Sequence, residues 1–362
     1  MFLLGLAAAA GAAPAAPAKN AAPAKAASAA DKPAKPKANA GVKPTRRAPL
    51  APLPPGPDVA WSHAPFEVGQ CNICHKSGDP KAPGPVVDNS NDMCFTCHEE
   101  IKEALAGRKF QHDAIDAGCT ACHNPHNSRY KKLLTDPAPQ LCYECHSDIE
   151  KVATTSKVRH GAITKERACL ACHNPHAANV EHLLIQLPYD LCVGCHSTND
   201  LADDNGKKLM NIKQLLTDNE VKHGPIAQKD CSACHQTHGS ANFRLLVQAY
   251  PEKFYSPYDP ANYALCYRCH NDQIMANATT TTLTKFRDGD RSLHYLHVHK
   301  EDRGRTCRAC HEVHASHKPH QIRDAVPFGS GGWMLPLNFK QTATGGQCEK
   351  TCHNTKTYAN KK

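Results

Sequence analysis

Apolar residues are unevenly distributed along the chain and divide it into three parts. Residues 1–13 form an apolar run ending in small residues, which is typical of a signal peptide and its cleavage region. Residues 14–57 are rich in Ala, Pro and Lys without periodicity, so we expect an extended linker. In the body, residues 58–362, no stretch approaches the roughly 18 consecutive apolar residues of a membrane-spanning helix. We therefore expect no membrane span in the body.

The composition makes this body a poor source of hydrophobic core. Only 40% of the 362 residues are hydrophobic and 6% are aromatic, whereas 20 are Cys and 24 are His. Of the net charge of +9, the linker contributes eight Lys and Arg residues against Asp31 alone. This basic segment lacks interleaved aromatic residues, which argues against nucleic-acid binding. The linker is either a solvated spacer or a tether to an anionic surface.

All 20 cysteines lie in ten clusters. Nine clusters read Cys-x-x-Cys-His, the attachment signature of c-type haem, and the last is one residue longer. Cysteines three residues apart share one face of a helical turn, so both thiols reach the vinyl groups of one porphyrin, and the next His reaches its iron. A disulfide framework or a zinc ribbon gives no reason for a His after every second Cys.

These clusters supply the expected attachment and proximal-ligand residues. The attachment pairs are Cys71 with Cys74, Cys94 with Cys97, Cys119 with Cys122, Cys142 with Cys145, Cys169 with Cys172, Cys192 with Cys195, Cys231 with Cys234, Cys266 with Cys269, Cys307 with Cys310 and Cys348 with Cys352. The proximal ligands are His75, His98, His123, His146, His173, His196, His235, His270, His311 and His353.

The clusters occur in pairs that form five repeats. The first cysteines of a pair are 23 residues apart in the first three repeats, 35 in the fourth and 41 in the fifth. These repeats, here called units one to five, are residues 63–98, 112–146, 160–196, 223–270 and 294–353. Such an internal repeat predicts an array of similar supersecondary units.

The repeated pattern His…CxxCHxxH…Leu-Leu…Leu-CxxCH resembles that of the doubled-CxxCH multihaem cytochromes over residues 63–353. The ten clusters make the chain similar to the decahaem conduits of outer-membrane porin–cytochrome complexes. The resemblance implies a multihaem cytochrome c fold, mostly coil with short α-helices and little β-sheet, wrapped around a stack of ten covalent haem c groups. It also implies an outer-membrane β-barrel as a partner. The linker and the segment 332–346 depart from the pattern of these conduits.

Further His residues decide between a carrier and a catalyst, because a haem iron with two His ligands has no open position. One His precedes each unit's first cluster by seven to nine residues, and we expect this upstream set to be distal ligands. It consists of His63, His112, His160, His223 and His299. A second set follows the first proximal His by three residues, and we expect each member to ligate a neighbouring haem of its own unit. It consists of His126, His176, His238 and His314.

The two sets give nine distal ligands for ten haems. Unit one has Gly78 where the second set has His, so we expect the haem on Cys94 and Cys97 to need a ligand from elsewhere. Four late residues are further candidates, namely His294, His297, His317 and His320. Their use stays open between the tenth haem, an adventitious metal site, and surface or propionate contacts.

The sequence predicts an electron carrier rather than an enzyme. Every cluster ends in His, and no phosphate-binding Gly loop, Ser-His-Asp arrangement or His-Glu-x-x-His motif appears. We expect export to the periplasm, the outer membrane or the cell exterior, because c-type haem is attached outside the cytoplasm. Three functions remain: a conduit or shuttle that passes electrons between redox proteins across or outside the envelope, a subunit of an extracellular cytochrome filament, and a reductase with one open haem.

Overall fold

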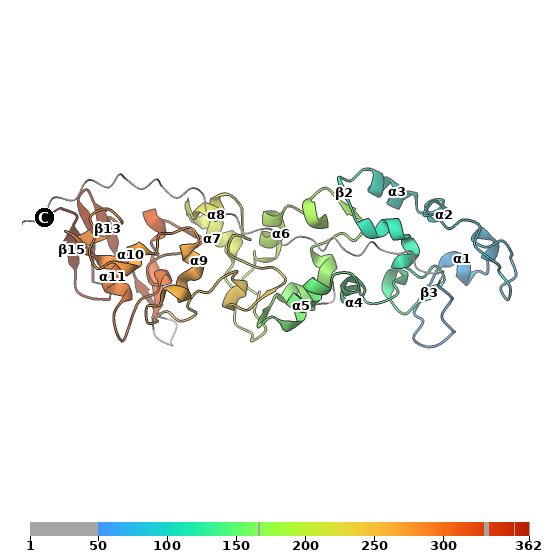
Figure 1. Ribbon diagram of the computed structural model, residues 1–362, viewed down its shortest axis with the longest axis horizontal. Helices are drawn as coiled ribbons and strands as arrows, with labels where there is room; N and C mark the ends of the chain where they lie inside the picture. The colour runs from blue at the N-terminus through green and yellow to red at the C-terminus, as the bar shows by residue number, and fades with distance from the viewer. Residues whose placement is uncertain (1–49, 166, 329–332, 351, 362) are drawn as a thin grey trace, which may run out of the picture. The chain divides into compact units, whose positions relative to one another are not determined.

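The computed structural model describes residues 50–165, 167–328, 333–350 and 352–361, so the expected signal-peptide-like segment and most of the linker lie outside it. Short helices and strands are joined by long coil (Figure 1). The helix α5 has nine residues, and no helix in the described ranges is long and apolar enough to cross a bilayer. The expectation of mostly coil with short helices is confirmed.

The helices and strands have the following bounds. The helices are α1 (Ala64–Glu67), α2 (Asp92–Phe95), α3 (Glu99–Ala106), α4 (Ala138–Tyr143), α5 (Ser147–Thr155), α6 (Pro188–Cys195), α7 (Ile212–Asp218), α8 (Gly224–Ala227), α9 (Ala264–Tyr267), α10 (Gln273–Ala276) and α11 (Leu293–Val298). The strands are β1 (Trp61–Ser62), β2 (Phe110–Gln111), β3 (Asn127–Ser128), β4 (Val158–Arg159), β5 (Ala177–Ala178), β6 (Val221–Lys222), β7 (Gly239–Ser240), β8 (Arg287–Asp288), β9 (Arg291–Ser292), β10 (Ala315–Ser316), β11 (Ala325–Phe328), β12 (Trp333–Pro336), β13 (Phe339–Thr342), β14 (Gly345–Cys348) and β15 (Lys356–Ala359).

Two-residue strands join each unit to the next. The strand that ends just before an upstream His pairs antiparallel with the strand that begins just after the second-set His of the following unit. The pairs are β1 with β3, β2 with β5, β4 with β7, and β6 with β10. The ladder continues into the histidines, since His63 donates its backbone N–H to His126 at 2.8 Å and His112 donates to His176 at 2.9 Å. The pairing therefore fixes an upstream His of one unit beside a second-set His of the next.

A loop inside each unit closes on the first proximal His. The backbone of this His bridges the residue eleven positions later, and this occurs in all five units: His75 with Val86, His123 with Leu134, His173 with Leu184, His235 with Leu246 and His311 with Ile322. The recurring Leu pairs of the sequence lie at these bridges. The local structure of the first cluster is thus the same in unit five as in units one to four.

The apolar core is concentrated in the carboxyl-terminal part of the described chain. One cluster of buried residues consists of Leu246, Tyr250 and Tyr263, with Tyr258 and Tyr267 packed against it. A second consists of Val326, Leu335 and Leu337. In units one to three the buried apolar residues are mostly alanines, such as Ala117, Ala168 and Ala178. Alanine side chains bury too little area to stabilise a fold alone.

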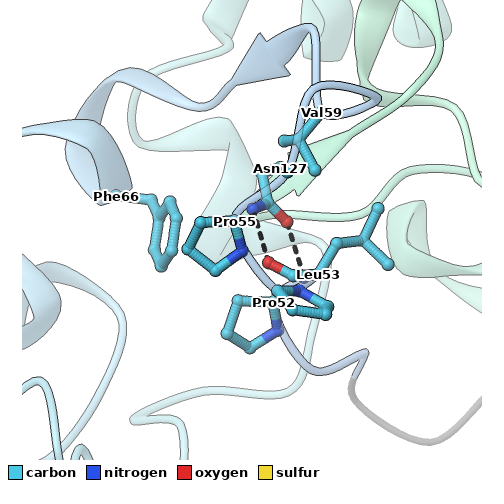
Figure 2. Close-up of a pocket in the computed structure, with 8 residues that line it drawn as sticks. Pro52, Leu53, Pro55, Val59, Phe66 and Asn127 are labelled. Carbon is cyan, nitrogen blue, oxygen red and sulfur yellow. Dashed lines mark hydrogen bonds between the residues drawn. The ribbon is translucent and has the colours of Figure 1, made fainter.

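A proline-rich strap, residues 50–56, covers the amino-terminal end of the array. The amide of Asn127 forms two hydrogen bonds with the backbone of Leu53, accepting from its N–H at 2.7 Å and donating to its carbonyl at 3.0 Å (Figure 2). The strap, Val59 and Phe66 line a pocket of about 430 Å³ beside this contact. The residues equivalent to Asn127 in the next three units are Ala177, Gly239 and Ala315. The strap therefore caps the first unit, as terminal repeats of an array require.

Candidate haem sites

Nine clusters fold into the same tight turn. In each of them the backbone N–H of the proximal His donates to the carbonyl of the first Cys, at 2.8 Å for His75, 3.0 Å for His123 and 3.1 Å for His235. This is the bond of one helical turn, so the two thiols of a cluster lie on one face. The tenth cluster differs because Cys348 ends the strand β14.

The two clusters of a unit differ in the exposure of their second cysteine. This cysteine is half-buried in the first cluster of every unit, and the residues concerned are Cys74, Cys122, Cys172, Cys234 and Cys310. It is exposed in the second cluster of every unit, and the residues concerned are Cys97, Cys145, Cys195, Cys269 and Cys352. All ten were expected as attachment residues from their spacing alone, and the spacing does not separate the two groups. Each unit thus offers one partly enclosed and one open attachment turn.

The proximal His rings lie opposite other His rings at a spacing that fits an iron between them. Within the described residues, nine of the ten have such a partner, with ring centres 6.0–6.5 Å apart and planes 6–31° apart. An imidazole nitrogen binds a metal ion at about 2.0–2.1 Å, so two imidazoles on opposite sides of one iron have ring centres roughly 6 Å apart. The spacing of these facing His rings matches that of a haem iron with two His ligands.

The partners follow a regular register. Each upstream His lies opposite the second proximal His of its own unit: His63 with His98, His112 with His146, His160 with His196 and His223 with His270. Each second-set His lies opposite the first proximal His of the preceding unit: His126 with His75, His176 with His123, His238 with His173 and His314 with His235.

This register corrects two expectations. The second-set His does not face a haem of its own unit, because the strand pairing carries it to the unit before. The haem on Cys94 and Cys97 does not lack a partner either, since His98 lies opposite His63 at 6.2 Å. Unit one has Gly78 in place of a second-set His, and both of its proximal rings have a facing partner without it.

Unit five departs from the register. Its first proximal His, His311, lies opposite His294 with ring centres 6.5 Å apart. The expected upstream ligand, His299, is instead exposed and stacks on Tyr295 at 3.9 Å, and its Nε2 lies 3.0 Å from the carbonyl of Met275. The expectation for His299 is therefore corrected, because the nitrogen that would bind an iron is committed to a backbone carbonyl.

The other late histidines have different surroundings. His297 is part-buried, and its Nδ1 lies 2.6 Å from the carbonyl of Leu293, which leaves Nε2 for another partner. Burial lowers its pKa, and His353 is among the charged neighbours that lower it further. His320 offers its backbone carbonyl to His311 at 2.8 Å, and both His317 and His320 are exposed.

A backbone carbonyl orients the first proximal His of every unit. The Nδ1 of this His lies 2.7–2.9 Å from the carbonyl of the residue nine positions later, which is Gly84, Lys132, His182, Arg244 or His320. All five residues have a left-handed backbone, with φ between 54° and 69°. Such a bond fixes the tautomer that leaves Nε2 for the iron. His320 was a candidate ligand because of its side chain, but the structure uses the backbone carbonyl at this position, a role that side-chain patterns do not predict.

The upstream histidines have the same kind of support from the next unit. The Nδ1 of His63 lies 2.9 Å from the carbonyl of Pro125, and that of His112 lies 2.9 Å from the carbonyl of Pro175. Burial lowers the pKa of His176, His196 and other ring partners, which favours the neutral imidazole that binds metals. In His63 and His112 the Nδ1 atom is thus held by a backbone carbonyl, which leaves Nε2 for a metal.

Cysteines of successive clusters lie next to one another across each unit boundary. The thiols that are hydrogen-bond partners are Cys94 with Cys119, Cys142 with Cys169, Cys192 with Cys231, and Cys266 with Cys307. In the chain without haem, this hydrogen bond raises the pKa of Cys142 and lowers that of Cys169 to about 7. The sulfur atoms that would carry two successive haems are therefore in contact.

Within a unit the two clusters are also close. Burial raises the pKa of Cys74, and the neighbouring Cys94 and Cys97 raise it further. The same holds for Cys310, whose pKa burial raises to about 12 with contributions from Cys348 and Cys352. The tenth cluster thus adjoins the ninth although its turn is different.

The cysteines and histidines do not converge in a way that would hold a bare metal ion. Across the described ranges, no group of three or more His, Cys, Asp or Glu side chains is placed to bind one. A porphyrin supplies four nitrogen ligands to its iron, so the protein needs to supply only two more. The pairs of facing imidazoles, each beside a two-thiol turn, match this requirement.

Comparison with known protein families agrees with this geometry. The family model of the doubled CXXCH motif matches the chain four times, at residues 63–103, 112–151, 160–201 and 223–275, and these matches contain units one to four. No curated protein matches the chain. The chain belongs to the doubled-CXXCH family of multihaem c-type cytochromes.

Proposed function

We propose that the chain binds ten covalent haem c groups and acts as an exported electron relay. One observation carries this proposal: cysteines of successive clusters adjoin one another from the first cluster to the tenth, with thiol–thiol contacts at four unit boundaries. Haem c supplies an iron that exchanges single electrons. The chain's residues hold these irons in sequence and fill their axial positions.

The axial ligands in this proposal are the nine facing histidines and, for the tenth site, His297. The neutral imidazole of His297 has a free Nε2, and His353 lies among its electrostatic neighbours. Ten irons with two imidazoles each have no open position, which supports a carrier rather than a reductase.

The relay form that we favour is a conduit across the outer envelope, working with a pore-forming partner and other redox proteins. The filament alternative loses the observation that motivated it, since His75 and His98 of unit one both have partners within the chain. Linear contact between successive clusters is the property that a conduit requires.

The test uses protein from a host that attaches haem c. Intact mass should give ten haems per chain, and magnetic resonance of the oxidised protein should give ten low-spin irons with no high-spin signal. Fewer haems would contradict the relay. A protein that purifies alone, and whose deletion leaves electron flow across the envelope unchanged, would contradict the conduit form.

A further inference from the structure

The residue two positions before each second-set His differs between unit five and the others. It is an amide in three units, Asn124, Asn174 and Gln236, and a carboxylate, Glu312, in unit five. The amides of Asn124 and Asn174 accept hydrogen bonds from the backbone N–H of His126 and His176, at 3.1 and 2.9 Å. Their role is to shape the local turn.

Glu312 faces the imidazole instead. It is 9% exposed, and its Oε1 lies 3.5 Å from the Nδ1 of His314. Its Oε2 accepts from the guanidinium of Arg323, which is also mostly buried. The Nδ1 of His314 is buried and forms no hydrogen bond within the described residues. The carboxylate is therefore the polar group available to this nitrogen.

His314 is the ring that faces His235, so Glu312 acts on the site at Cys231 and Cys234. The two rings are 6.4 Å apart and 8° from parallel, a fit for an iron bound through both Nε2 atoms. In that arrangement Nδ1 of His314 carries a proton and points to a carboxylate. A carboxylate partner makes an imidazole a more basic ligand, which stabilises the ferric iron.

The other axial ligand of this site is supported as well, because Nδ1 of His235 lies 2.9 Å from the carbonyl of Arg244. Two basic groups lie near Glu312: Arg323 is its direct partner, and Arg308 is a charged neighbour. Arg323 keeps the carboxylate charged in a buried position and also offsets part of its effect on the iron.

We propose that Glu312, acting through His314, lowers the reduction potential of the haem on Cys231 and Cys234 below those of the corresponding haems in units one to three. This inference rests on the proposed haem relay. The seventh haem is then the last of these to be reduced. Six haem sites precede it along the chain and three follow it. In a partly reduced protein the electrons should therefore reside on these two groups of haems rather than on the seventh.

Glu312→Gln in the intact holoprotein tests the proposal by redox titration followed optically and by magnetic resonance. The variant should shift one haem of ten, the one on Cys231 and Cys234, to higher potential. Arg323→Gln should shift it the opposite way, because it leaves the carboxylate uncompensated. Gln236→Glu places a carboxylate beside His238 and should lower the potential of one further haem, on Cys169 and Cys172.

A purely structural role predicts other results. If Glu312 only pairs with Arg323, both single variants lower the melting temperature, and the potential of the haem on Cys231 and Cys234 either stays unmoved or shifts in the same direction in both. Either result overturns the proposal, as does Gln236→Glu without a shift. Intact mass and spin count on the same samples distinguish a failure of the relay from a failure of the role of Glu312. Fewer than ten haems in wild-type protein would overturn the relay itself. Ten low-spin haems with unmoved potentials would overturn only the role of Glu312.

Discussion

The imidazole that faces the first proximal His has a different origin in units one to four and in unit five. In units one to four an upstream His faces the second proximal His of the same unit, and in units two to five a second-set His faces the first proximal His of the preceding unit. In unit five, His294 from the unit's own helix α11 faces the first proximal His, His311. The ring that faces the first proximal His therefore comes from the following unit in units one to four and from the same unit in unit five.

The two regions also differ in how they are stabilised. The early units bury alanines and short strand pairs, so the bound porphyrins would have to form their core. Around the junction of units four and five, Tyr250 and Tyr263 pack edge to face at 5.8 Å, and Val326 and Leu335 form another cluster. Unit five and the junction before it thus bury aromatic and β-sheet residues of the chain, where units one to three bury mainly alanines.

Removal of the haems should produce the largest difference in stability between the two regions. In a chain produced without haem attachment, the backbone amides of residues 58–222 should have no protection from hydrogen exchange. Buried alanines alone cannot offset the entropy cost of folding. Residues 243–361 should keep some protected amides in the sheet of β13, β14 and β15 and around Tyr263. Hydrogen exchange with mass spectrometry measures both, and equal protection of the two regions would contradict the comparison.

Tyr263 tests the carboxyl-terminal core. It is 1% exposed, so Tyr263→Ala should lower the free energy of unfolding of this region by about 3–5 kcal/mol. The matched control is Tyr263→Phe, because the buried hydroxyl has no hydrogen-bond partner among the described residues, and we expect a change of less than about 1 kcal/mol. Thermal unfolding checks both, and a larger loss in the Phe variant would show that the hydroxyl is needed.

His63 and His299 hold the same place in the repeat and should behave differently. His63→Ala should convert one of the ten low-spin irons to high spin, since His63 faces His98. His299→Ala should leave all ten low-spin, because its Nε2 is bonded to the carbonyl of Met275. Magnetic resonance of the oxidised variants gives the count. A high-spin signal in the His299 variant would restore it as a ligand.

Removing the contact that holds the strap should give the smallest effect. Asn127→Ala introduces the residue of units three and five and removes two hydrogen bonds to Leu53, which should destabilise the strap by about 1–3 kcal/mol. Limited proteolysis should then cut residues 50–60 faster, with haem content unchanged. Ala177→Ser is a control at the equivalent position of unit three, where no strap lies. Unchanged cleavage of the Asn127 variant would contradict the capping role.

The sequence predicts the cluster chemistry well because it depends on local spacing. Cys-x-x-Cys-His closes one helical turn, so its geometry follows from residues within five positions of one another. The upstream histidines of units one to four are also where spacing places them. The recipient of each second-set His could not be predicted, because two-residue strands such as Trp61–Ser62 leave no periodic pattern, and it is their pairing across units that selects the partner.

Unit five shows the limit of alignment by spacing. His299 lies eight residues before Cys307, but the strand pairs that precede an upstream His in the described part of the chain are those at His63, His112, His160 and His223. The hairpin of β8 and β9 and the helix α11 instead turn His294 and His297 inward and leave His299 beside Tyr258 and Tyr295. The role of the residue nine positions after the first proximal His of each unit was equally hard to predict, since a left-handed backbone leaves no sequence trace unless it requires Gly, as at Gly84.

The most direct test of the account is an experimental structure of the purified holoprotein. The account predicts ten haems in chain order, with the iron on Cys71 and Cys74 bound by His75 and by His126 of the following unit. Fewer than ten haems, or His126 bound to the iron on Cys119 or Cys142 of its own unit, would contradict it.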